Sequence, residues 1–477
     1  MGLFSENTSL LYLSILIIPV LSIVISRQSV SFPKLFSFSG STQFGIAAGI
    51  SLFCGTAFSV LLTIMPYINN SLLAIGISFS LIAVLLALAF NSTRISTAAV
   101  SFIDGVSPLL RIVTSAVVVI FFAVIHTTAL IYIGSLLAGY FFEGSLYLFV
   151  VINVIVAGFV VLMGDRMTLL VNNAMLGFLS LLTLLALVII PDATFLLEKI
   201  LAETLKAQPE SFFAGTNDVF FPFYAPIGIS LLSWWIWWID HYMPHRQWSE
   251  EKDMVMNSVT TFFLIVTIAA LLLILTWSLR RADVPFIVNE SPAVAFPVFF
   301  LFSFLFLGSL FRSFSIVKMF SFQISVWLST EGLVREKDIL VSRLVVAAFA
   351  IISILLFPVA EIFGARIIAL NLITIACFIV PIISVFFLFT FWRRLAGGGI
   401  SAGILSGLFL GIAMFVAAVP ATFANTPSIF DPVLMSVISF AVTAVSAVAA
   451  TLFFEKKEQR WKKLRLVSAN DNINKVS

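Results

Sequence analysis

Three ionisable residues stand inside long apolar stretches of this sequence. His126 lies in the run VIHTTAL, and Arg312 and Lys318 lie in the run around Gly308. A guanidinium has five fixed donors and suits a carboxylate, whereas an imidazole titrates near neutral pH and can relay a proton or contact a substrate. Because ionisable groups in membrane segments usually mark ligand or ion pathways, these residues predict a site for an anionic solute or for the carboxylate of a zwitterion.

Each of the three residues also has a structural explanation. Arg312 can pair with helix carbonyls, and His126 can be a neutral imidazole that is hydrogen-bonded across helices. Lys318 lies about 9 Å nearer the inside than Arg312 at 1.5 Å per helical residue, so its long stem can snorkel to the cytoplasmic interface. We favour snorkelling for Lys318 and leave both explanations open for His126.

The segment SWWIWWIDHYMPHR, residues 233–246, joins four tryptophans to a polar run. Five successive helical residues turn through more than a full circuit, so the indoles cannot all face one ligand. An interfacial aromatic belt or packing explains some of them, and others are expected to line the inner half of a pathway. Asp240, His241 and His245 are expected near an inner vestibule. Two histidines four residues apart can bind a metal, but no third ligand is evident, and a solvated loop is the preferred explanation.

Composition places these residues in a membrane. Hydrophobic residues make up 61% of the chain, charged residues 10%, and the mean hydropathy is +1.14, which is too apolar for one soluble core. The net charge of +3 is too small to indicate binding of nucleic acid. Cys54 and Cys377 lie in apolar runs, so a disulfide is not expected. The sequence has no nucleotide-binding loop, nucleophilic triad or pair of membrane carboxylates, so we do not expect an enzyme.

About thirteen apolar stretches are long enough to cross a hydrocarbon core of ~30 Å as helices. Of the 26 Lys and Arg residues, nineteen fall in one set of alternate loops and the C-terminal tail, and five fall in the other set. Because basic residues concentrate on the cytoplasmic side, we predict a multi-pass protein of the cell membrane with its N-terminus outside and its C-terminus inside. The spans are centred near residues 18, 55, 81, 123, 154, 180, 230, 269, 308, 351, 378, 408 and 442.

Glycine and proline cluster in two of these spans, and both helices can therefore unwind near the membrane centre, as transporter helices do at binding sites. Ordinary kinking or close packing is the alternative. The clusters are Gly45, Gly49 and Gly55 in one span, and Pro222, Pro226 and Gly228 in the other. The four-residue spacing of Gly403, Gly407 and Gly411 predicts close packing of another helix.

The segment ATFLLEKILAETLKA, residues 193–207, has a helical apolar face. That face holds Leu196, Leu197, Ile200, Leu201 and Leu205, and the charged residues lie elsewhere. We predict a short amphipathic helix on the outer surface, with binding of a partner as the less favoured alternative.

Several stretches resemble, in the right order, the sodium/solute symporter family of sodium-coupled sugar and proline carriers. GISLFCGTAFS (49–59) resembles the first core helix of the family, and residues 102–141 look like the third with its preceding loop. GDRMTLLVNNAMLG (164–177) is similar to the segment entering the fifth, and DHYMPHRQWSEEKD (240–253) to the end of the sixth. FWRRLAGGGISAGILSGLFLG (391–411) resembles the helix after the core.

The resemblance implies two inverted repeats of five helices, with one helix before them and two after, and alternating access around a central cavity. The first and sixth core helices would be the interrupted ones. The expected divisions are an N-terminal helix and first loop (1–42), the first repeat (43–192), an extracellular amphipathic segment (193–219), the second repeat (220–394), two further helices (395–454) and a basic cytoplasmic tail (455–477).

The sequence departs from this family where the family binds sodium. A small residue and a hydroxyl pair on the eighth core helix correspond to Ser309, Arg312 and Ser313, and a family aspartate corresponds to Asn173. On a helix, the first three share one face, so a guanidinium points where sodium should bind. The resemblance implies these equivalents of the ion site: Cys54, Ala57, Asn173, Ser309, Arg312 and Ser313. Its implied substrate residues are Gly55, Thr56, His126, Ser233, Trp234 and Trp237.

The expected function is secondary active transport of a small organic solute, such as an amino acid or carboxylate, by alternating access and without strict dependence on sodium. The alternative is a transporter-derived sensor or regulatory subunit that binds solute without moving it. The expected partners are the solute and the lipid bilayer, not nucleic acid, and the basic tail EKKEQRWKKLR can also meet a signalling partner. No cofactor is expected, and sodium, usual in the family, is doubtful here.

Overall fold

The computed structural model describes thirteen segments of the chain, and every element in them is helical. The described segments are residues 17–19, 41–64, 107–141, 146–164, 166–190, 196, 199–200, 221–242, 292–328, 336–392, 395, 397–423 and 431–473. The predicted spans near residues 81 and 269 lie outside them. Within the described part, nine helices are long and apolar enough to cross a membrane, which confirms the all-helical membrane class.

The helices of the first predicted repeat are α3 to α9. Their bounds are Ser41–Ile64 for α3, Pro108–Ile120 for α6, Phe121–His126 for the π-helical segment η2, Thr127–Phe141 for α7, Leu146–Met163 for α8 and Arg166–Ile189 for α9. The segments α6, η2 and α7 form one continuous rod. Ser107 caps its start by accepting from the Leu110 amide, and Pro108 occupies the first helical position, where no backbone donor is needed.

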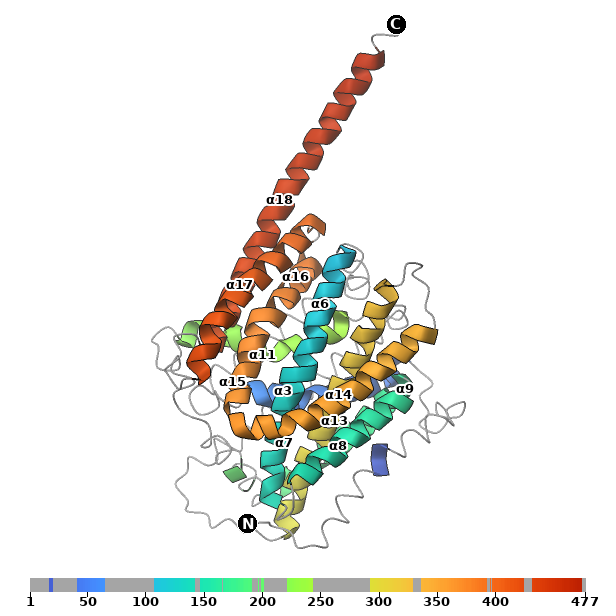
Figure 1. Ribbon diagram of the computed structural model, residues 1–477, viewed down its shortest axis with the longest axis vertical. Coiled ribbons are helices and arrows are strands. Elements are labelled where there is room, and N and C mark those ends of the chain that lie inside the picture. Colours follow the sequence, from blue (N-terminus) through green and yellow to red (C-terminus); the bar gives the residue numbers. More distant parts are fainter. Residues whose placement is uncertain are drawn as a thin grey trace.

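The helices of the second predicted repeat and the C-terminal pair follow. They are Phe221–Tyr242 (α11), Pro292–Leu328 (α13), Glu336–Phe363 (α14), Arg366–Thr374 (α15), Ile375–Ile379 (the π-helical η4), Val380–Phe391 (α16), Gly397–Phe423 (α17) and Pro432–Ile473 (α18). Asp431 caps the start of α18: its carboxylate accepts from the backbone N–H of Val433 at 3.2 Å, and Pro432 again occupies the first helical position. Figure 1 shows α18 continuing beyond the other helices toward the C-terminus.

Helix α13 lies at the centre of the bundle. Of its apolar window, 83% is buried inside the protein, compared with 22% for α14, so α13 packs on protein and α14 presents most of its surface outward. Helix α13 contacts α3, α6, α7, α8, α9 and α14. A charge carried by α13 is therefore held among other helices, which is where ionisable residues are tolerated at membrane depth.

The expected break in the two glycine- and proline-rich spans is absent from the described residues. Helix α3 is continuous through Gly49 and Gly55, and α11 is continuous through Pro226. Close packing explains the glycines: a Cβ on Gly228 would lie 2.5 Å from the Val433 carbonyl oxygen of α18. The regular helical hydrogen bonding changes instead in two other helices, at η2 and η4.

Two further predictions agree with the described residues: the apolar face of residues 193–207 and the close packing of the glycine face of α17. Leu196 and Ile200 are buried while Lys199 between them is exposed, as the amphipathic face requires. Helix α17 packs closely along its glycine face: a Cβ on Gly403 would lie 2.8 Å from the Ala447 side chain of α18, and one on Gly411 would overlap the Cys377 carbonyl of η4.

Candidate functional site

Helices α3, α9 and α13 meet at Cys54, which is fully buried. A Cβ on Gly177 of α9 would lie 3.1 Å from the Cys54 Cβ, and one on Gly308 of α13 would lie 2.8 Å from the Cys54 carbonyl oxygen. The Cys54 thiol also donates to the Phe304 carbonyl at 3.5 Å. Glycine on both neighbours is thus what lets three backbones converge. The structure brings together the three helices that carry the expected equivalents of the ion site.

Arg312 extends from α13 along α3 at this junction. A Cβ on Gly55 would lie 3.1 Å from the Cβ of Arg312 and 3.4 Å from its Cδ, so the arginine stem packs against the surface that Gly55 leaves free. The Nε and Nη2 atoms of the guanidinium are buried. Gly55, which the resemblance placed among the substrate residues, therefore faces Arg312. It directly follows Cys54 on α3.

The remaining expected ion-site residues lie on the same helices. The Ser313 hydroxyl donates to the Ser309 carbonyl at 3.0 Å, and the Ser309 hydroxyl is buried without a hydrogen-bond partner. Asn173 on α9 is 3% exposed, and its Oδ1 atom accepts from the side-chain Nδ2 of Asn172 at 3.3 Å. Ala57 is half-buried. Buried polar atoms thus lie on α9 and α13, the two helices that meet α3 at Cys54.

The other expected substrate residues on α3 and α11 can be placed less fully. Thr56 is buried and its hydroxyl donates to the Leu52 carbonyl within α3 at 2.8 Å. The Ser233 hydroxyl on α11 is buried without a hydrogen-bond partner. The backbone of Trp234 and Trp237 lies in α11, and their side chains lie outside the described residues, as do those of Asp240, His241 and His245.

His126 connects three helices through its two ring nitrogens. Its Nε2 lies 3.1 Å from the Ser59 hydroxyl of α3, and its Nδ1 lies 3.2 Å from the Asn371 amide oxygen of α15. An amide oxygen only accepts, so Nδ1 carries the hydrogen, and the Nε2 of a neutral ring accepts from Ser59. All three residues are at most 2% exposed. This is the cross-helix hydrogen bonding that was one of the two explanations left open.

Sequence reasoning missed Asn371 and gave Ser59 no role. Asn371 was visible as a lone amide within an apolar run, and Ser59 as the last serine of the stretch GISLFCGTAFS. Neither signal indicates a partner, because Asn371 is 245 residues from His126 along the chain. The Nδ2 atom of Asn371 is buried without a hydrogen-bond partner.

Lys318 has protein partners that the snorkelling explanation did not foresee. Its ammonium donates to the Val161 carbonyl at 2.5 Å and to the Gly164 carbonyl at 3.2 Å, at the C-terminal end of α8. The last carbonyls of a helix lack intrahelical donors and carry partial negative charge, so a cation is stabilised there. Lys318 therefore joins α13 to the end of α8.

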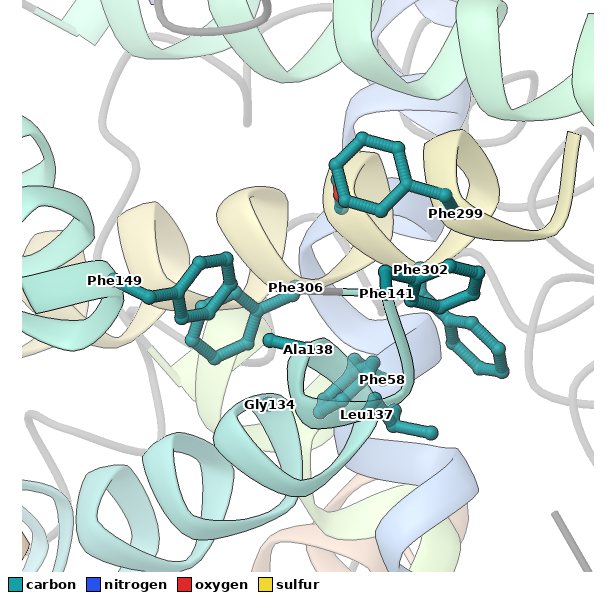
Figure 2. A pocket seen from close by; sticks show the side chains of 10 residues that line it. Phe58, Gly134, Leu137, Ala138, Phe141, Phe149, Phe299, Phe302 and Phe306 are labelled. Carbon is teal, nitrogen blue, oxygen red and sulfur yellow. The ribbon is translucent and has the colours of Figure 1, made fainter. Parts of the chain in front are cut away.

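A small cavity lies between α3, α7, α8 and α13, away from these polar groups (Figure 2). The Phe306 ring is stacked on Phe149 at 5.9 Å between ring centroids and meets Phe58 edge-on at 5.6 Å. The lining is apolar except for one serine, so the cavity offers only apolar contact. It is lined by Phe58, Gly134, Leu137, Ala138, Phe141, Phe149, Phe299, Phe302, Ser303 and Phe306.

The fold resembles that of a sodium-coupled sialic acid symporter solved in a substrate-bound, outward-open state. The two structures agree with a TM-score of 0.64 at 14% sequence identity, over 94% of this chain and 98% of the symporter. A mutant manganese transporter of Eremococcus coleocola matches with a TM-score of 0.47 at 16% identity, over 87% of this chain and 95% of that one. No protein-family model and no curated protein matches the sequence. The first comparison shows that the chain shares its helical fold with this symporter over almost its whole length.

Proposed function

We propose that this protein is a secondary transporter that moves a small organic solute across the cell membrane by alternating access. The observation that carries the proposal is the guanidinium of Arg312 on the central helix α13, whose Nε and Nη2 atoms are buried and whose stem packs against α3. Burying a cation at membrane depth costs several kcal/mol, and proteins usually bear this cost at substrate or ion pathways. The shared fold with a solute symporter supports the same conclusion.

The charge of the site favours an anion as solute. In the described parts of α3, η2, α13 and α15, the ionisable residues other than thiols are His126, Arg312, Lys318 and Arg366, and none is an acid; the acid of α11, Asp240, stands two residues before the end of that helix. A carboxylate accepts two hydrogen bonds from a guanidinium, which an organic cation cannot do. The solute class we propose is therefore a carboxylate or a zwitterion bound through its carboxylate.

We also propose that Arg312 replaces the sodium ion that couples transport in the sodium/solute symporters. Its stem lies on Gly55, between Cys54 and Thr56 of α3, so its donors can bridge α3 and α13 permanently, where an ion would do so reversibly. Asn173 in α9 supports this proposal, because an amide does not supply the charge of a carboxylate to an ion.

Untargeted uptake tests the proposal while the solute is still unidentified. Purified protein in liposomes is incubated with a cell metabolite extract, and accumulated compounds are identified by mass spectrometry against protein-free liposomes. We expect at least one carboxylate to accumulate. If compounds bind to the protein in detergent but none accumulates, the chain is a sensor. If the accumulated compounds are organic cations, the proposed solute class is wrong.

A further inference from the structure

We propose that Ser59, His126 and Asn371 form a proton-binding site in which the proton is held at the Nε2 atom of His126. The neutral ring donates from Nδ1 to Asn371 and accepts at Nε2 from Ser59. A proton that binds Nε2 turns this nitrogen into a donor, and the Ser59 oxygen can accept from it because a hydroxyl both donates and accepts. The ring therefore gains one proton and one positive charge without leaving either partner.

The hydroxyl hydrogen of Ser59 needs another acceptor once the ring is protonated. On a helix, a serine hydroxyl readily donates to the carbonyl four residues earlier, as Ser180, Ser313 and Ser384 do here. For Ser59 that carbonyl belongs to Gly55, the residue against which the Arg312 stem packs. Protonation of His126 is thereby communicated along one turn of α3 to the junction with α13.

Two of the three helical rods that hold the network, those of His126 and Asn371, depart from regular α-helix beside it. The segment η2 ends at His126, and η4 begins four residues after Asn371. A π-helical turn inserts an extra residue into the helical pattern at some cost and is frequent at functional sites. The Phe121 and Phe122 rings flank the imidazole, with centroids 5.5 and 5.1 Å away. A network that only joined helices would not require a titratable ring or two such segments.

The pH at which the His126 ring takes up a proton depends on the charges carried by the surrounding helices. The elements packed against η2 are α6, α7, α13, α14 and α15, and α3 contributes Ser59. Their ionisable residues are Arg111, Tyr132, Tyr140, Arg312, Lys318, Glu336, Lys337, Asp338, Arg343, Glu361 and Arg366, with Cys54 on α3. Asp338 accepts from Ser325, and Glu361 is exposed.

Among these residues, Arg312 is the cation whose stem packs against Gly55, and Gly55 lies one helical turn before Ser59 on α3. Two cations in a poorly hydrated site repel each other, so a bound anion favours the protonated ring. This step rests on the proposed function: in a carrier of carboxylates, the proton and the anionic solute would bind together.

Nuclear magnetic resonance of the imidazole nitrogens tests the proton site directly. The chain has three histidines, so the variant H241Q/H245Q, labelled with ¹⁵N-histidine in liposomes, reports on His126 alone. We expect hydrogen on Nδ1 only at neutral pH, and on both nitrogens at acidic pH. Asn371→Leu removes the acceptor, so hydrogen should move to Nε2 in the neutral ring, whereas the control Ser51→Ala on α3 should change nothing. A parent ring with hydrogen on Nε2, or one that stays neutral at every pH at which the protein is folded, overturns the proposal.

A second measurement asks whether the site couples to transport. Liposomes with an imposed proton gradient should accumulate the compound found in the extract more than liposomes without one. This ratio should fall toward one in Ser59→Ala and Asn371→Leu. A ratio that stays above one and unchanged in both variants shows that this site does not couple the proton gradient to transport. If no compound accumulates at all, the proposed function fails while the resonance measurement still decides the proton site.

Discussion

At the scale of single residues, Arg312 makes the ion dependence of this protein a testable property. A tethered guanidinium occupies its position in every state of the cycle, whereas a bound ion is present only at sufficient concentration. Its stem packs against Gly55 of α3, and the proposal is that its guanidinium joins α3 and α13 in place of an ion.

Replacement of Arg312 by serine should expose this difference. Wild-type accumulation in liposomes should be the same in sodium and in potassium buffer. Arg312→Ser removes the proposed charge-assisted hydrogen bonds, for which about 1.5–3 kcal/mol is typical, so accumulation without sodium should fall by roughly tenfold or more. Sodium should restore part of it, because Ser313 and the new serine form a hydroxyl pair. Wild-type uptake that rises steeply with sodium, together with an unaffected variant, contradicts the substitution and leaves Arg312 a structural role.

A second residue-scale prediction concerns the junction at Cys54. A methyl group at Gly308 would overlap the Cys54 thiol and lie 2.8 Å from its carbonyl oxygen. Gly308→Ala should therefore destabilise the fold by about 1–3 kcal/mol, because backbone cannot move aside cheaply. Gly139→Ala is the matched control, since its Cβ would lie 3.7 Å from the Leu146 side chain and alanine is the better helix former. Thermal unfolding in detergent should show a lower midpoint than the wild type for Gly308→Ala and not for Gly139→Ala. Equal midpoints for the two variants would mean that the junction at Cys54 is loosely packed.

At the scale of elements, the inner part of α13 is joined to α8 by one side chain. The Lys318 ammonium reaches the Val161 and Gly164 carbonyls, which a helix end leaves without intrahelical donors. The contact stabilises a group of helices formed by α7, α8, α13 and α14, which pack on one another.

Lys318→Met should therefore destabilise the protein by about 1 kcal/mol for each hydrogen bond lost. Methionine keeps most of the apolar stem, so the loss reports on the ammonium. Lys318→Arg can still donate to both carbonyls and should retain more stability. Thermal midpoints measured in liposomes decide the matter: if both variants unfold with the wild type, the ammonium contributes nothing to the packing of α8.

At the scale of the whole molecule, the distribution of basic residues among the loops predicts the orientation in the membrane. We expect cysteines placed singly at Ser9 and Ser468 to be labelled from opposite faces of intact cells, with Ser468 reached only after permeabilisation. Cys54 and Cys377 are both fully buried and should give little background. Labelling of both positions from one side would exclude an odd number of spans and with it the count of thirteen.

Helix α18 gives the molecule its extension beyond the bundle. Its 42 residues span about 63 Å, roughly twice the hydrocarbon thickness, and its apolar window ends at residue 453. The basic tail thus continues as a helix away from the other elements (Figure 1). Such a helix is a place for a signalling partner, which remains a prediction.

The sequence by itself determined the membrane class, the positions of the described spans and the presence of charge on α13, because hydrophobicity along a single helix is a local property. It also predicted close packing at Gly403 and Gly411, since residues four apart share one helix face. Unwinding at Gly55 and Pro226, which the resemblance implied and for which kinking or close packing was the alternative, is absent from the described helices α3 and α11, because glycine serves close approach as well as unwinding.

Only the tertiary structure decided which polar groups meet. Ser59, His126 and Asn371 come from three helices, and Lys318 reaches carbonyls more than 150 residues away along the chain. In a largely apolar chain each of these residues looks alone, because a hydrogen-bond partner on another helix leaves no trace in local periodicity. The pairing follows from how the helices pack, and that packing gives His126 and Lys318 hydrogen-bond partners on other helices.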